Sequence, residues 1–96
     1  MLILRYEFVN DFFEKRTAHR QSHLDYLNGL VDERIIVAGG VLMEATPSGM
    51  IVLDTNDISL AHKIALNDPY RVNKLISEFH VIEWKVVVGG YLSKQS

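Results

Sequence analysis

Two hydrophobic periodicities alternate along the chain in an order that few folds accommodate. Every second residue from Leu2 to Val9 is strongly apolar, which predicts a strand with one face on a core. A helix is predicted next, ending at about Glu33. It begins either at Asp11, which with Glu14 has the spacing of a capping box, or near Thr17. Its apolar residues recur at the spacing of an amphipathic helix and comprise Leu24, Leu27, Leu30 and Val31.

The middle of the chain predicts strands joined by a turn. Ile35–Ala38 is rich in β-branched residues and predicts a second strand, and the pair Gly39-Gly40 indicates a bulge or a close approach of the backbone. Thr46–Gly49 has strong turn chemistry between two apolar runs. Val41–Glu44 and Met50–Asp54 are therefore predicted to be the arms of a hairpin.

The second half of the chain predicts a helix followed by a strand. The helix begins at Ile58 and ends at Asp68-Pro69-Tyr70, because a proline disfavours the helical conformation of the residue before it. A short helical piece from Pro69 to Ile76 is predicted beyond it. The last strand, Phe79–Val88, shows the clearest alternation and precedes a polar C-terminal tail at residues 92–96.

The resulting order of elements is β-α-β-β-α-β. It defines an α+β fold in which right-handed crossovers place both helices on one face of a four-stranded antiparallel sheet. The strands at residues 2–9 and 79–88 offer apolar side chains to both faces, so the face without helices would expose a patch that requires a partner. We therefore predict a homodimer that packs sheet against sheet, with pockets between the sheet and the first helix.

Length and charge limit the classes of function. The 96 residues suffice for a single domain with one core, spanning residues 1–96. A formal charge of -2 lacks the basic excess of nucleic-acid binders. No apolar run reaches the roughly 20 residues of a membrane span, and the first residues lack the features of a signal peptide. We expect neither nucleic acid nor membrane as a partner, and a cytoplasmic location.

The chain contains no cysteine. Disulfides, thiolate catalysis and cysteine-bound zinc are therefore excluded for these residues, as is typical of proteins in a reducing compartment.

His23 is the residue on which the functional interpretation depends. It lies within the apolar stripe of the first predicted helix, one turn before Leu27. An imidazole is well suited to moving protons at cellular pH, and a carboxylate bonded to its other nitrogen fixes the tautomer needed for a general base. Asp68 can reach His23 because both helices lie on one face of the sheet. Such a dyad suits isomerisation, elimination or hydrolysis and requires neither metal nor organic cofactor.

Structural explanations exist for the same residues. His23 could bond a backbone carbonyl at the edge of the core, and Asp68 before Pro69 is a typical N-cap. Capping leaves one carboxylate oxygen for other contacts. His19 and His23 have the spacing of zinc ligands, but a third ligand and the glutamate of the metalloprotease signature are missing.

Three aromatic residues are candidates for a pocket wall. Tyr70 and Trp84 could contact an aromatic ligand, and Tyr6 lies near the middle of the first predicted strand. In a small domain such residues also serve as core.

Several short motifs resemble, in their order and spacing, those of the YCII (YciI-like) family. They are Glu14-Lys15-Arg16, Arg20, His23-Leu24, Leu27, Ala38-Gly39, Asp68-Pro69-Tyr70, and Glu83-Trp84 followed by valines and Gly89. The resemblance extends from Met1 to about Tyr91. It implies a ferredoxin-like βαββαβ fold of the dimeric α+β barrel superfamily, in agreement with the fold predicted from the periodicities.

The same resemblance implies a small-molecule enzyme with a histidine and an aspartate in its active site. These residues correspond to His23 and Asp68, and Arg20 falls at an often basic position that would hold an anionic ligand. The sequence departs from the family at Gly40, where a proline is frequent, and at residues 71–75, which lack a common glycine. The resemblance therefore implies no particular substrate.

The sequence thus predicts a dimeric, ferredoxin-like, cofactor-free enzyme. His23 and Asp68 are its predicted catalytic residues, and Arg20, Tyr70 and Tyr6 are predicted to bind a small anionic or aromatic substrate. No metal site is expected. The alternatives are a non-catalytic module that binds a small ligand in the same cleft and a purely structural dimerisation domain.

Overall fold

A computed structural model describes residues 1–89 and shows a four-stranded antiparallel sheet. The strands are β1 (Leu2–Phe8), β2 (Ile36–Leu42), β3 (Ser48–Leu53) and β4 (Ile76–Glu83). Their order across the sheet is β2-β3-β1-β4, so the two strands that are central in the sheet are β3 and β1. This is the order of a ferredoxin-like sheet, and the predicted α+β fold is confirmed.

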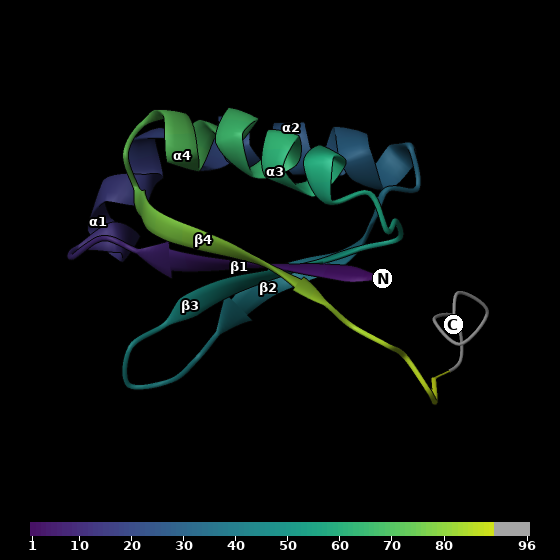
Figure 1. Cartoon of the computed structure of the whole chain (residues 1–96). Helices are drawn as coiled ribbons and strands as arrows, with labels where there is room; N and C mark the ends of the chain where they lie inside the picture. Colours follow the sequence, from purple (N-terminus) through teal and green to yellow (C-terminus); the bar gives the residue numbers. More distant parts are fainter. Residues whose placement is uncertain (90–96) are drawn as a thin grey trace.

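The helices lie together on one side of this sheet (Figure 1). They are α1 (Phe12–Lys15), the 3-10 helix η1 (Arg16–Ala18), α2 (Arg20–Asp32), α3 (Ile58–Asn67) and α4 (Pro69–Val72). The first predicted helix is therefore divided into three pieces, with a break at His19, where φ is -120°. The predicted capping box is wrong, because Asp11 has a φ of 61° and its side chain caps no backbone group.

The main core lies between the sheet and the helices. Alternate residues of β1 are buried there, and Tyr6 is among the largest fully buried side chains. From the helix side, α3 buries Ala61, Ile64 and Ala65. No residue of α2 is fully buried, and its leucine stripe only packs partly against the core. The helix that carries His23 thus leaves space between itself and the sheet.

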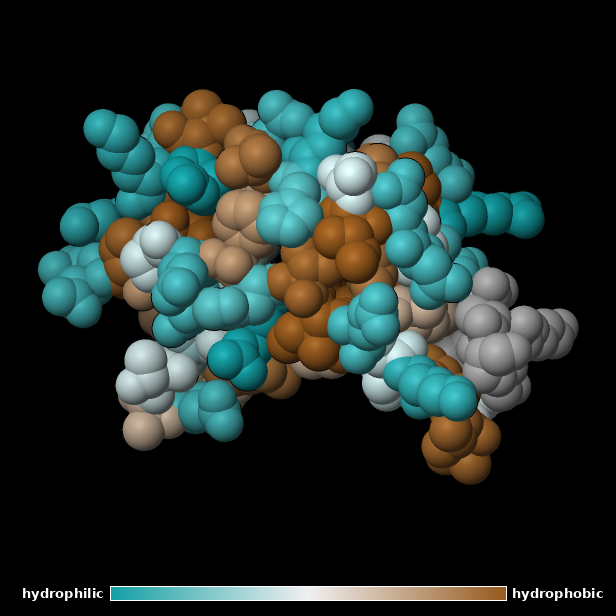
Figure 2. All heavy atoms as spheres, in the orientation of Figure 1, coloured by the Kyte–Doolittle hydropathy of each residue, from teal (hydrophilic) through white to brown (hydrophobic). Residues whose placement is uncertain are grey.

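The last strand is shorter than predicted, because β4 ends at Glu83 and not at Val88. The segment after it packs on the sheet face opposite the helices, where a second cluster forms from Met1, Val52 and Val86 with Met50 and Trp84 at its edge. The chain itself therefore covers part of the face that the sequence suggested would be free. Figure 2, in the orientation of Figure 1, views the molecule from the side and shows hydrophobic side chains in the middle of that surface. The predicted polar tail at 92–96 lies outside the described residues.

Of the two alternatives predicted for the glycine pair of β2, a bulge or a close approach of the backbone, the bulge is not seen at the pair itself. The register shifts between Ile36 and Ala38, whereas Gly39 and Gly40 continue the regular pairing with β3. A Cβ on Gly39 would stand 3.4 Å from the side chain of Ile51, an ordinary contact distance.

Within residues 1–89 no helix is long and apolar enough to cross a membrane.

Candidate active site

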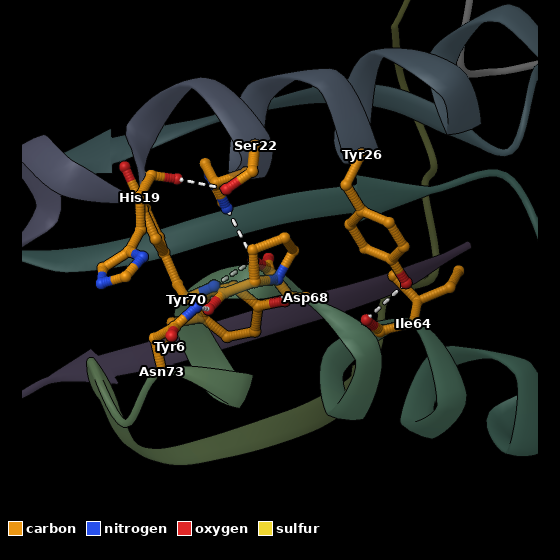
Figure 3. A network of polar contacts seen from close by, with 10 residues as sticks. Tyr6, His19, Ser22, Tyr26, Ile64, Asp68, Tyr70 and Asn73 are labelled. Carbon is orange, nitrogen blue, oxygen red and sulfur yellow. Dashed lines mark hydrogen bonds and ion pairs between the residues drawn. The ribbon is translucent and has the colours of Figure 1, made fainter.

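Asp68 lies at the centre of a buried polar network. Its side chain has no solvent exposure, and the residue joins α3 to α4 as the N-cap of α4 with Pro69 at N1. Oδ1 accepts a hydrogen bond from the backbone N–H of Tyr70 at 2.9 Å, and Oδ2 accepts one from the hydroxyl of Tyr6 at 3.0 Å. Figure 3 shows these groups converging beneath α2. The bonds compensate the carboxyl group for its removal from water.

His23 completes this network from α2. Its Nδ1 lies 2.7 Å from Oδ1 of Asp68, and its side chain is 12% exposed. Because an ionised carboxylate can only accept hydrogen bonds, the network assigns the proton of a neutral imidazole to Nδ1. Within residues 1–89 Nε2 has no hydrogen-bond partner. The lone pair of Nε2 is therefore the one available to a ligand.

The imidazole plane is fixed by aromatic stacking. The ring of Tyr70 lies parallel to that of His23, with centroids 3.6 Å apart and an interplanar angle of 6°. Phe12 in turn meets the Tyr70 ring edge-on at 5.3 Å. A ring held by a carboxylate in its plane and an aromatic ring on its face has little freedom to rotate, as a precisely oriented base requires.

A second contact fixes the helix that carries His23. The hydroxyl of Tyr26, less than one turn further along α2, donates a hydrogen bond to the backbone carbonyl of Ile64 on α3 at 2.8 Å (Figure 3). The bond joins the two helices that position His23 and Asp68.

A pocket of about 330 Å³ opens beside the dyad, between α2 and the β2–β3 hairpin. Its polar lining includes His23, Arg16 and Arg20, and most of the remaining lining is apolar or aromatic. Three glycines, Gly39, Gly40 and Gly49, occupy lining positions on the sheet. The absence of side chains there leaves the room that α2 does not fill.

Both tyrosines of the site keep their protons at neutral pH. Burial is the main cause that raises the pKa of Tyr6 far above its usual range, and the nearby charge of Asp68 adds to it. Burial also raises the pKa of Tyr70, against the opposing effect of the guanidinium groups of Arg16 and Arg20. Tyr6 is thus a neutral phenol that donates its hydrogen bond to Asp68.

The structure brings together all five residues that the sequence singled out. His23, Asp68 and Tyr6 are joined by hydrogen bonds, while Arg20 and Tyr70 line the pocket beside them. Trp84 does not belong to the pocket, because it packs in the second cluster on the opposite face of the sheet.

Three further pocket residues, Arg16, Phe12 and Gly39, were not predicted from the sequence. Arg16 precedes Arg20 by four residues, and that spacing is a signal that could have identified it. No comparable signal exists for Phe12 or Gly39, because their place in the lining depends on how α1 and β2 pack.

The described residues also hold one group of potential metal ligands. Glu7, Glu78 and His80 have ligand atoms within 4.8 Å of one another on the sheet face opposite the helices. His80 already contacts Glu7 at 2.7 Å, and this contact is the main reason that the pKa of Glu7 is lowered. The three side chains form a surface cluster that is separate from the pocket.

The fold and the site together define a ferredoxin-like α+β protein in which a partly buried histidine is paired with a buried aspartate beside a pocket. A family model described as the YCII-related domain matches residues 1–85. The chain belongs to the YCII-related family.

A solved structure has the same fold. It is the 5-chloro-2-hydroxyhydroquinone dehydrochlorinase TftG of Burkholderia phenoliruptrix AC1100, in complex with 2,5-dihydroxybenzoquinone. The two chains share 23% sequence identity with a TM-score of 0.74, and the match covers 88% of this chain and 94% of the other. The comparison with curated proteins finds no match.

Proposed function

We propose that this protein is a small-molecule enzyme in which His23 acts as the general base through Nε2. The observation that carries the proposal is the 2.7 Å contact of Nδ1 with the buried Asp68, made by a histidine that lines the pocket. Asp68 orients the imidazole and stabilises the imidazolium that forms. A well-placed general base accelerates a reaction by roughly 10²- to 10⁴-fold.

Among isomerisation, elimination and hydrolysis, we favour elimination. Nε2 takes an acidic proton of the substrate, either from a carbon next to a carbonyl group or from an enol hydroxyl. The electron pair left behind forms an enolate, which then makes a new double bond while the leaving group departs with its own bonding pair, and the imidazolium returns the proton to water. The dehydrochlorinase of the same fold supports this choice, since its named reaction is an elimination.

The remaining predicted residues take supporting roles. Arg20 binds a negatively charged substrate, whereas Tyr6 and Tyr70 act mainly through the dyad, by hydrogen bonding Asp68 and by stacking on His23. The step described here requires no cofactor. The absence of cysteine in the chain supports a cytoplasmic protein.

A non-catalytic binding module is the second candidate. The largely apolar lining of the pocket favours it, because such a surface binds a flat ligand without chemistry. In that case the His23–Asp68 pair would serve only to position a hydrogen bond to the ligand.

The enzyme proposal is tested by measuring the release of halide from chlorinated hydroxyhydroquinones. The first compound to test is 5-chloro-2-hydroxyhydroquinone. We expect turnover by the wild type and a loss of 10²-fold or more with His23→Ala. His19→Ala is the matched control, since His19 precedes His23 by one turn but does not line the pocket. Equal rates for wild type and His23→Ala would contradict the proposed base, and binding without turnover would favour the module.

A further inference from the structure

Two guanidinium groups line the same pocket as the dyad. Arg16 comes from η1 and Arg20 from the first turn of α2. Arg20 precedes His23 by three residues, so that their side chains share one face of the helix. The pocket therefore carries positive charge close to the proposed base.

Neither arginine is neutralised by a carboxylate. The ion pairs within residues 1–89 join His23 with Asp68 and His80 with two glutamates, and none includes Arg16 or Arg20. The pocket lining itself contains no aspartate or glutamate. Two like charges at one pocket repel each other, and an anion between them would relieve that repulsion.

Arg16 is held in place by aromatic side chains. Its guanidinium carbon lies 4.7 Å from the ring centroid of Phe13 and 5.7 Å from that of Phe12. Such cation–π contacts orient a planar guanidinium and leave its N–H groups free at the edge of the group. A preoriented arginine loses less entropy when it binds an anion.

The rest of the lining suits a ring. Apolar and aromatic side chains form most of the pocket wall, among them Phe8, Phe12, Leu24, Leu27, Val41 and Ile51. The volume of about 330 Å³ lies at the small end of ligand pockets and suffices for a molecule of one ring.

We propose that Arg16 and Arg20 together form an anion subsite, and that the ligand is a small, flat, cyclic anion with its charged oxygens on these two residues. Its ring lies on the apolar wall beside Nε2 of His23. This assignment rests on the proposed function for its chemistry, where the same guanidinium groups would stabilise the enolate oxygen that forms when His23 removes a proton.

Binding of 2,5-dihydroxybenzoquinone, a ring whose hydroxyl groups are acidic, tests the subsite by titration calorimetry. We expect the wild type to bind this anion at least about tenfold more tightly than neutral hydroquinone, and the difference to shrink as salt is added. Arg16→Gln and Arg20→Gln should each weaken anion binding by about tenfold and leave hydroquinone binding unchanged.

Lys15→Gln is the matched control, because it removes the same charge one residue away from Arg16 without touching the pocket lining. An equal loss of binding with Lys15→Gln would overturn the subsite, because it would show that only the overall positive charge matters. Equal affinity of the wild type for the two rings would also overturn it.

His23→Ala separates this inference from the proposed function. We expect it to abolish turnover while the dependence of anion binding on Arg16 and Arg20 persists. Arginine-dependent binding without any turnover by the wild type would keep the subsite and reject the enzyme. Turnover that depends on His23 but is unchanged by both arginine substitutions would keep the enzyme and reject the subsite.

Discussion

Asp68 combines two roles at one buried position. Its Oδ1 caps α4 and contacts His23, and its Oδ2 accepts the hydroxyl of Tyr6. Loss of one partner would leave a buried acceptor unsatisfied, at a cost of about 1–3 kcal/mol. The structural explanation and the functional one therefore do not compete, because the cap holds the carboxylate in the place where it orients the imidazole.

Tyr6→Phe should change the response of stability to alkaline pH. The folded state raises the pKa of Tyr6 above its ordinary value of 10.0, so the unfolded chain loses this proton first and stability falls as the pH rises above that value. In Tyr6→Phe the free energy of unfolding should therefore fall less steeply with pH, and the difference from the wild type should be about 1.4 kcal/mol per pH unit. A smaller fall of the free energy of unfolding with pH should remain in this variant, because the pKa values of Tyr26 and Tyr70 are also raised.

Urea unfolding of both proteins over a series of alkaline pH values measures this slope. The same variant should lose about 1–3 kcal/mol at neutral pH, because Oδ2 of Asp68 loses its donor. Identical slopes for wild type and Tyr6→Phe would show that Tyr6 does not remain protonated in the folded state.

Local signals in the sequence explain how much of the site could be predicted. The Asp-Pro pair is a helix start by chemistry alone, so the position of Asp68 before α4 follows from the sequence. His23 lies on the inner stripe of α2 by spacing alone. The stacking of Tyr70 on His23 could not be predicted, because it depends on the angle at which α4 follows α3.

The strands were predicted better than their ends. Alternation identified β1 and β4, but β4 ends at Glu83 because the next residues turn to the other face of the sheet and pack around Val52. The alternation shows which residues are apolar, but it does not show where the strand leaves the sheet. The division of the first helix near His19 escaped prediction for a similar reason, since no proline or glycine marks the break.

Gly39→Val should fill the pocket without disturbing β2. A Cβ at this position makes only an ordinary contact with Ile51, and valine is favoured in strands. We expect the variant to be at least as stable as the wild type and to bind 2,5-dihydroxybenzoquinone at least about tenfold more weakly.

Gly29→Ala on α2 is its control, because a Cβ there meets nothing within 4 Å. It should stabilise the helix by about 0.5–1 kcal/mol and leave binding unchanged. Undiminished binding by Gly39→Val would show that the pocket beside β2 is not the binding site.

The two faces of the sheet differ. Helices cover one face and form the site, whereas the opposite face combines the cluster around Val52 with partly exposed residues such as Ile82, which is 39% exposed and pairs with Ile3. The second cluster reduces the apolar area available to a partner but leaves this part of the face uncovered.

We therefore predict a homodimer formed through the face opposite the helices. Sedimentation of the wild type at micromolar concentration should show twice the mass of the chain, and Ile82→Glu should shift it to the monomer, since a buried carboxylate at the interface is costly. Leu66→Glu, on the exposed side of α3, should leave the dimer intact. A monomeric wild type would refute the prediction.

The position of the proton on the His23 ring decides whether Nε2 can act as a base. In a long-range ¹H–¹⁵N correlation spectrum of the neutral ring, we expect a proton on Nδ1 and a free lone pair on Nε2. Asp68→Asn should weaken or reverse this preference, because the amide no longer requires a donor at Nδ1. A wild-type spectrum with the proton on Nε2 would contradict His23 as the base that faces the pocket.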